Sequence, residues 1–233
     1  MSYSLTDLID VERYPIDDLQ GHGAHLVETC QQVIRDTAIC HLPGFVRPEA
    51  VEAIRVEAVA RQQHTYWMDV PRRAYSWRNP DDYAAGHPVT MGTPNLIGTI
   101  TTDVFERDSA FVSLFQLPEL TAFLRATLEV PSLYPVACPH LAANVKVMAQ
   151  GCKHAWHFDQ NDSAVTFMIQ NAEAGGHYEY VPYLRSEKDE NYAGVERLLK
   201  GDNAGVVRED LHHGSFCLFK GRRSLHRVTE VAQ

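Results

Sequence analysis

Beyond Pro139 the chain is divided into short segments that are apolar or alternate between apolar and polar residues, and this pattern limits the fold most strongly. Glycine, asparagine and aspartate, which favour turns, separate the segments. The segments are Ala143–Met148, Ala155–Phe158, Ala164–Gln170, His177–Tyr183 and Ser215–Phe219. Each has the length and pattern of a β-strand, and several short strands in succession predict a sandwich or a double-sheet jelly roll.

The part of the chain before Pro139 has helical periodicity instead. Apolar residues recur along one face of 23–36, a second helix is expected to begin at Pro48, and a third at Pro118. Residues 64–100 are rich in aromatic residues, arginine, proline and glycine without a clear period, which predicts an irregular covering loop or part of a site.

These two patterns together predict an α+β fold in a single domain spanning residues 1–233. Residues 1–138 are expected to supply mainly helical support and covering loops, and residues 139–233 the jelly-roll core. A charged, partly helical insert is expected at 185–213, between the fourth and fifth predicted strands.

The charge balance excludes some classes of partner. The chain has 30 acidic against 21 basic residues and a formal net charge of −9. This disfavours nucleic-acid binding and a polybasic membrane surface. No apolar run approaches the roughly 20 residues of a membrane span, and the acidic N-terminal segment does not resemble a signal peptide. The 5 cysteines are widely spaced, without a C-x-x-C pair. We therefore expect a reducing, cytoplasmic location and a small-molecule ligand. Oligomeric state is not predicted.

The candidate site begins with His157 and Asp159. In a strand these two side chains project to one face, while Phe158 projects to the other. An imidazole and a carboxylate on one face are two ligands of a 2-His-1-carboxylate iron site, which a histidine from another strand would complete. The H-x-[DE] pattern is weak alone, since roughly one H-x-D is expected by chance. The same chain offers a competitor, His177 with Glu179.

A second histidine lies near the end of the chain. The segment 214–219 is expected to be a strand, 220–223 a turn, and His226 to lie in the next strand. In this arrangement the chain resembles the Fe(II)/2-oxoglutarate-dependent oxygenases, in which an H-x-D strand is followed by an apolar strand, a short turn and a distal histidine. The resemblance implies a double-stranded β-helix core, Fe(II) and 2-oxoglutarate as cofactors, and His157, Asp159 and His226 as metal ligands.

Three runs of residues indicate one branch of this superfamily. They are N-V-x-V-M-x-x-G-x-x-H-A-W-H-F-D from Asn144, G-G-H-Y-E-Y-V-P-Y-L-R from Gly175, and L-F-K-G-R-R-S-L-H-R-V from Leu218. They are similar to a branch that contains free-amino-acid hydroxylases and carrier-independent lysine-type halogenases. The alignment places Glu179 outside the metal strand. Halogenases of this branch have glycine or alanine where Asp159 stands, so the resemblance implies hydroxylation. The implied reaction is hydrogen abstraction by a ferryl species, with release of succinate and CO₂.

The resemblance also suggests residues that recognise the substrate. His154 matches a position that contacts the amino-acid head of the substrate, and Asn144 is a candidate cosubstrate or substrate contact. His140 lies where members that bind a basic side chain have an acidic residue, which disfavours lysine as the substrate. Each of these residues could instead have no functional role. His154 and His140 could be surface histidines, and the Asn144 side chain could form hydrogen bonds with the backbone.

Two further regions are candidates on chemical grounds. Asn161 follows the metal-binding strand and could line the pocket or cap a turn. Arg72, Arg73 and Arg78 lie in one loop and could clamp a carboxylate, although arginines are commonly solvated on a protein surface.

The chain departs from the superfamily pattern at its end. Members usually bind the distal carboxylate of 2-oxoglutarate with an arginine or lysine about ten residues beyond the distal histidine, and the sequence stops at Gln233 before that position. We expect the main 2-oxoglutarate anchor and the last core strand to lie outside the given chain. The alternatives are a non-catalytic cupin-like domain that binds a metal or ligand, a 2-oxoglutarate-independent metal enzyme, and a 2-oxoglutarate-dependent oxygenase of another small metabolite.

Overall fold

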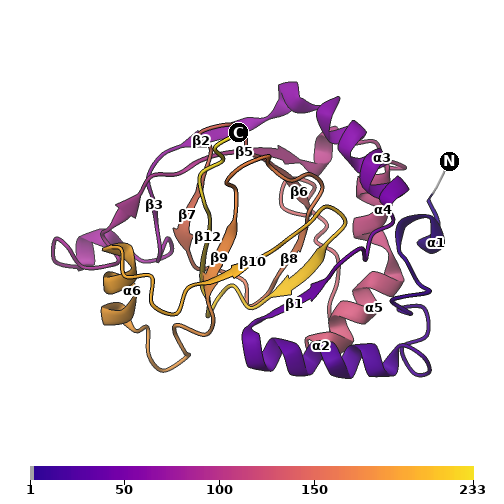
Figure 1. Cartoon of the computed structure of the whole chain (residues 1–233), viewed down its shortest axis with the longest axis horizontal. Helices are drawn as coiled ribbons and strands as arrows, with labels where there is room; N and C mark the ends of the chain where they lie inside the picture. The colour runs from indigo at the N-terminus through magenta and orange to yellow at the C-terminus, as the bar shows by residue number, and fades with distance from the viewer. Residues whose placement is uncertain (1–2) are drawn as a thin grey trace.

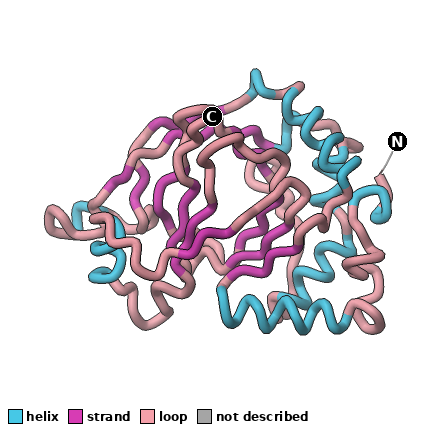
Figure 2. Tube along the Cα trace, viewed as in Figure 1, coloured by secondary structure: helices cyan, strands magenta, loops and turns pink. Residues whose placement is uncertain are grey.

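The fold, in a computed structural model that describes residues 3–233, is a jelly roll supported on one side by helices (Figures 1 and 2). Two antiparallel sheets form its core. One has the strand order β10-β9-β12-β7 and the other β1-β11-β8. The strands of the first sheet are β7 (His154–His157), β9 (Tyr178–Val181), β10 (Val207–Glu209) and β12 (Leu225–Val228), and those of the second are β1 (Ile39–Leu42), β8 (Ala164–Phe167) and β11 (Phe216–Phe219).

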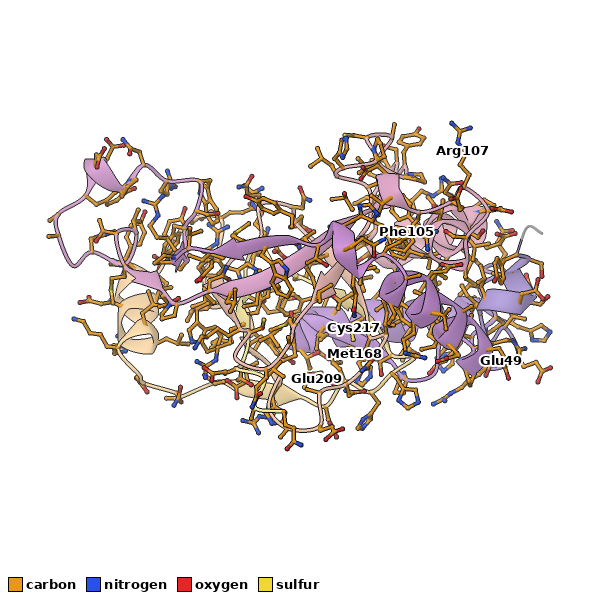
Figure 3. The ribbon with its side chains drawn as sticks, turned by 90° about the horizontal axis from the view of Figure 1, so that it is seen from above. Glu49, Phe105, Arg107, Met168, Glu209 and Cys217 are labelled. Carbon is orange, nitrogen blue, oxygen red and sulfur yellow. The ribbon has the colours of Figure 1, made fainter. Side chains whose placement is uncertain are left out.

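The inner faces of the two core sheets meet through aromatic side chains. The ring centroid of Phe219 on β11 lies 5.4 Å from that of Tyr180 and 5.6 Å from that of Tyr178, both on β9. Cys217 lies in the interior beside them, whereas Glu49 and Arg107 project from the helical end of the molecule (Figure 3). The alternating pattern of the strands therefore produces a filled interior between the sheets.

Helices cover the outer face of the sheet β1-β11-β8 (Figure 1). They are α1 (Leu5–Leu8), α2 (Ala24–Thr37), α3 (Pro48–Val59), α4 (Ala110–Gln116) and α5 (Pro118–Thr127). Phe45 is fully buried at the centre of this layer, with ring centroids 4.6 Å from Phe216 of β11 and 6.0 Å from Phe123 of α5. The predicted helices at 23–36, Pro48 and Pro118 are thus confirmed, within a residue at their starts, while α4 was not predicted.

The outer face of the sheet β10-β9-β12-β7 is covered by a second apolar cluster. Tyr75, Phe158 and Leu225 are fully buried in it, together with residues of α6 (Tyr192–Leu199). Arg185 is also buried there, with its guanidinium 4.7 Å from the rings of Trp77 and Phe158 and its Nη1 2.6 Å from Glu190 Oε2. Arg185 lies at the start of the segment expected to be a charged insert, yet it is buried, because its partners come from three separate segments.

A third sheet lies beside the core. It has the order β2-β5-β6, and a two-stranded ribbon β3-β4 adjoins it. These strands are β2 (Tyr66–Asp69), β3 (Arg72–Arg73), β4 (Gly92–Thr93), β5 (Leu96–Thr101) and β6 (Asn144–Val147). The prediction that 64–100 is irregular was therefore wrong. Short 3-10 helices occur at Gln62–His64, Pro80–Asp82 and Thr102–Val104.

All six strands predicted beyond Pro139 are present, as β6, β7, β8, β9, β11 and β12. The segment 185–213 was expected to be a charged, partly helical insert, and α6 confirms its helical part. It also supplies β10, which was not predicted, pairs with β9 and extends the core sheet. Among residues 3–233, no helix is both long and apolar enough to cross a membrane.

Candidate metal centre

Three side chains converge where β7 pairs with β12, at the β7 edge of the sheet β10-β9-β12-β7. His157 on β7 and His226 on β12 are direct partners in the strand register, and Asp159 follows the end of β7. Asp159 Oδ1 lies 3.7 Å from the Nε2 atom of each histidine. Candidate ligand atoms of the three residues, one from each, all lie within 4.8 Å of one another. The structure thus brings together the three residues that the sequence suggested as metal ligands.

The orientation of both imidazoles is fixed by backbone carbonyls. His157 Nδ1 lies 2.8 Å from the carbonyl oxygen of Ala155, and His226 Nδ1 lies 3.0 Å from that of Ser224. A carbonyl only accepts, so each Nδ1 carries the hydrogen and donates it. The lone pair of each Nε2 is then left facing Asp159, as in histidines that bind metals.

The electrostatics of the centre keep both imidazoles neutral. Burial lowers the pKa of His157 well below its ordinary value, and His226, His154 and Arg72 lower it further. Burial also lowers the pKa of His226, against an opposing effect of the Asp159 carboxylate. A neutral imidazole is the form that can donate its lone pair to a metal.

Asp159 is held by its backbone and leaves one oxygen unpaired. Its backbone N–H donates to the carbonyl oxygen of Gly221 at 3.0 Å. Its Oδ2 atom is buried and has no hydrogen-bond partner among the described residues. A buried carboxylate oxygen without a donor is costly. A divalent cation would compensate it, so these three residues fit a 2-His-1-carboxylate centre with open positions for other ligands.

His154 lies on the same face of β7 as His157 because β7 is irregular. Regular alternation would place His154 and His157, three residues apart, on opposite faces. The pairing of β7 with β12 shifts register between His226↔His157 and Val228↔His154, which is a β-bulge. The two imidazole rings consequently lie 4.1 Å apart, and burial, followed by the charge of Arg72, lowers the pKa of His154 to about 2.

Arg72 is the other predicted substrate residue that lies near the centre. Its side chain is half-buried, and its Nε atom is buried without a hydrogen-bond partner among the described residues. Burial lowers the pKa of Arg72, and the Asp159 carboxylate opposes that shift. Arg73 follows it on β3 and therefore projects to the opposite face.

The remaining candidates lie elsewhere or have other partners. His140 is exposed, with its Nδ1 3.3 Å from Asp103 Oδ1. Asn161 is exposed in the loop after Asp159, and Asn144 is exposed on β6. Arg78 donates to Glu190 Oε1 at 2.8 Å, so it is already paired.

The competing motif faces away from the centre. Glu179 of β9 is paired with Arg227 and Arg208, at 2.7 and 2.8 Å, on the outer face of the sheet. The neighbouring Tyr180, not Glu179, is the register partner of His226. Glu179 is thus a structural ion-pair residue.

Two residues near the centre were not predicted. The ring of Tyr178 lies 5.9 Å from that of His226, and burial, with a contribution from Asp159, raises the pKa of Tyr178 well above its ordinary value. Lys146 lies on β6 and lowers the pKa of His154 through its charge. Alternation from Asn144 could have identified Lys146, since residues two apart share a face.

Comparison with solved structures supports the fold. An oxidoreductase of the 2OG-Fe(II) oxygenase family from Burkholderia pseudomallei is 12% identical with a TM-score of 0.55, covering 88% of this chain and 84% of that one. The carbocyclase SnoK of nogalamycin biosynthesis is 12% identical with a TM-score of 0.59, covering 88% and 78%. The epimerase SnoN, solved with Fe³⁺, alpha ketoglutarate and nogalamycin RO, is 13% identical with a TM-score of 0.54, covering 90% and 79%.

At these identities the solved structures establish the shared jelly-roll fold. No curated protein matches the chain in sequence. The sequence profile of one family, HalD, described as Halogenase D, matches residues 23–233, which is nearly the whole chain. The chain therefore belongs to the Halogenase D family and has the fold of the 2-oxoglutarate-dependent Fe(II) oxygenases.

Proposed function

We propose that the protein is an Fe(II)- and 2-oxoglutarate-dependent oxygenase that hydroxylates a free L-amino acid or a close derivative. One observation carries the proposal: the Nε2 atoms of His157 and His226 converge on Asp159 Oδ1 at 3.7 Å, in a site where Asp159 Oδ2 has no described partner. The fold shared with an enzyme solved with iron and alpha ketoglutarate supports the choice of both cofactors.

In this proposal His157 and His226 hold the metal through Nε2 and Asp159 through its carboxylate. Bound Fe(II) with 2-oxoglutarate and O₂ supplies the oxidising power to hydroxylate a C–H bond, with release of succinate and CO₂. The protein orients its own donors through the carbonyls of Ala155 and Ser224. It also keeps both imidazoles buried and neutral, which preserves their lone pairs for the metal.

Hydroxylation is favoured over halogenation although the family carries the name of a halogenase. On a bound metal, chloride would need the position that the Asp159 carboxylate would occupy. The surrounding backbone is adapted to that carboxylate, since the N–H of Asp159 donates to Gly221 and Gly221 has no side chain to displace it. The chain therefore offers the Asp159 carboxylate as a third protein ligand for the metal.

Recognition of an amino acid is assigned to His154 and Arg72. Both lie beside the three ligand residues, one as a neutral imidazole and the other as a guanidinium with an unpartnered Nε. A guanidinium binds a carboxylate through two parallel hydrogen bonds, and a neutral imidazole can accept from an ammonium group. No contact among the described residues supports a similar role for Arg73, His140 or Asn161.

The test is an anaerobic titration of the purified protein with Fe(II) and then 2-oxoglutarate, followed by the visible band of the iron–ketoacid complex. Each standard L-amino acid is then added in turn. A band that one amino acid perturbs would support both the reaction class and the substrate class. Bound iron without a band would favour a cupin-like binding domain, and a His157→Ala variant that still bound iron fully would refute the ligand assignment.

A further inference from the structure

The strand that carries His157 lies at the edge of its sheet. In the order β10-β9-β12-β7, only one side of β7 pairs with a neighbouring strand of this sheet, β12. The backbone N–H and C=O groups on the other side need partners from elsewhere, because buried backbone groups are almost always paired. Ala155, within β7, is 5% exposed, so solvent does not supply its partners.

A backbone ladder reaches this side of β7 but ends after one pair of residues. Leu96, the first residue of β5, and Lys153, which precedes β7, exchange two hydrogen bonds of 3.0 and 2.9 Å in an isolated antiparallel bridge. Hydrogen-bonded pairs of such a ladder recur at every second residue, so the next pair would be Pro94 and Ala155. Proline has no N–H, so this segment cannot donate to the carbonyl oxygen of Ala155.

The side chain of Asn95 supplies the backbone partner that is missing. Its Oδ1 accepts the N–H of Ala155 at 3.1 Å. Asn95 is 3% exposed, and its Nδ2 atom is buried without a hydrogen-bond partner among the described residues. A buried donor without an acceptor is costly, so the amide is not placed there to satisfy its own nitrogen. Its oxygen holds the backbone of β7.

The carbonyl oxygen of Ala155 is consequently available to His157, whose Nδ1 lies 2.8 Å from it. The N–H and C=O of one strand residue point to the same side, so the hydrogen bond from Ala155 to Asn95 also fixes the direction of this carbonyl. His226 is held differently. Its Nδ1 donates to the carbonyl oxygen of Ser224, whose N–H donates to a backbone carbonyl in the preceding turn. A side chain therefore supports one imidazole and a backbone turn the other.

We propose that Asn95 is a positioning residue for the metal centre. It fixes the carbonyl oxygen of Ala155, which holds the His157 imidazole with its Nε2 lone pair directed toward Asp159. This inference rests on the proposed function, because it takes His157 as a metal ligand. Hydrogen bonds that orient a ligating imidazole contribute about 10- to 100-fold to metal affinity. Asn95 acts through one further residue, so we expect an effect of about 10-fold.

The experiment observes the imidazoles directly, by long-range ¹H–¹⁵N NMR spectra of the metal-free protein, which report which ring nitrogen carries the hydrogen. His157→Gln and His226→Gln assign the resonances. Asn95→Leu keeps the side-chain volume and removes the acceptor, whereas Asn95→Asp keeps an acceptor. Asn171→Ala is the matched control, because the Asn171 side chain also forms two hydrogen bonds with backbone groups, in a loop after β8. Anaerobic titration with Fe(II) then measures metal affinity.

Both imidazoles are expected to carry the hydrogen on Nδ1 in the unmodified protein. In N95L the His157 ring is expected to become a mixture of tautomers, while His226 stays unchanged because the Ser224 carbonyl does not depend on Asn95. N95D should restore the single tautomer of His157. Fe(II) affinity should fall about 10-fold in N95L and remain unchanged in N171A.

Unchanged His157 resonances in N95L, or equal changes at His157 and His226, would overturn the inference. Equal Fe(II) affinity of N95L and N171A, in a protein that binds Fe(II), would also overturn it. If circular dichroism shows that N95L does not fold, Asn95→Ala is measured in its place. An unmodified protein that bound no Fe(II) would refute the proposed function, while the spectra of the metal-free protein would still decide whether Asn95 orients His157.

Discussion

Gly221 and Asp159 are in contact so close that any side chain at position 221 would require the Asp159 side chain to move. A Cβ atom placed on Gly221 would lie 1.8 Å from Asp159 Oδ2 and 2.7 Å from its Cγ. The carbonyl oxygen of the same glycine accepts the backbone N–H of Asp159 at 3.0 Å. The turn that precedes β12 thus determines both where the Asp159 backbone lies and how its carboxylate is directed.

Gly221→Ala is therefore expected to displace the Asp159 side chain and to weaken Fe(II) binding by about 10- to 100-fold, the range for loss of a metal-orienting contact. Metal affinity measured by anaerobic titration, with circular dichroism as the check of folding, tests this. In an Asp159→Gly background the carboxylate is absent, so adding G221A should cost no further affinity. An equal loss in both backgrounds would show that the clash is not the cause.

Asp159→Gly is expected to abolish the proposed hydroxylation, because it removes the proposed third protein ligand and leaves both histidines in place. Product analysis by mass spectrometry, in buffers with and without chloride, measures the outcome and shows whether the vacated position supports halogenation. Hydroxylation at the unmodified rate in D159G would exclude Asp159 as a ligand.

The stability of the metal-free protein is expected to depend on pH through its buried histidines. The pKa of His154 is lowered to about 2, and those of His157 and His226 are also lowered, in each case mainly by burial. Below the unfolded value of about 6.5 the unfolded chain binds more protons than the folded one, so the free energy of unfolding falls as pH decreases.

The expected loss is at most about 1.4 kcal/mol per pH unit for each histidine. Urea unfolding at about pH 7.5, 6.5 and 5.5 measures it. His154→Asn, which cannot take up a proton in this range, should flatten the dependence between about pH 6.5 and 5.5. A variant with the same dependence as the unmodified protein would show that His154 does not contribute.

Arg185→Met is expected to lower the free energy of unfolding by on the order of 3 kcal/mol, because it removes one partner of a buried charged network. Arg185 is 8% exposed and joins Glu190 to the carbonyl oxygen of Arg222 while contacting Phe158. Arg78→Met removes the other arginine bound to Glu190, but 41% of the Arg78 side chain is exposed, far more than of Arg185, so its loss should cost about 1 kcal/mol or less. Equal losses in urea unfolding would contradict this account.

Alternation along single strands placed His157 and Asp159 on one face but did not separate them from the competing pair His177 and Glu179. The resemblance to the Fe(II)/2-oxoglutarate-dependent oxygenases was needed to choose between the pairs and to add His226. Alternation failed for 64–100, where β2 pairs with β5, and β5 pairs on its other side with β6 from a distant part of the sequence. It also failed for Arg185, whose burial depends on Trp77 and Glu190. Interactions between distant segments decide such cases, and one sequence does not reveal which segments meet.

His154 is the clearest example of this limit. Its strand alone predicts that it faces away from His157, and the resemblance to a family suggested its role without a structural reason. The reason is the register shift opposite Val228, a property of two strands together.

The bulge in β7 also bears on how substrate preference could be changed. Regular pairing of all four residues of β7 with β12, without the bulge, would turn the His154 side chain to the outer face, on the side of Trp156 and Arg227. Deleting one residue between His154 and His157 would instead remove the bulge and keep both histidines on one face. The pairing of this short stretch with β12, not only the identity of its side chains, therefore decides which groups line the metal centre. Single-residue insertions and deletions in β7 are accordingly a route to altered selectivity that a survey of point substitutions would never sample.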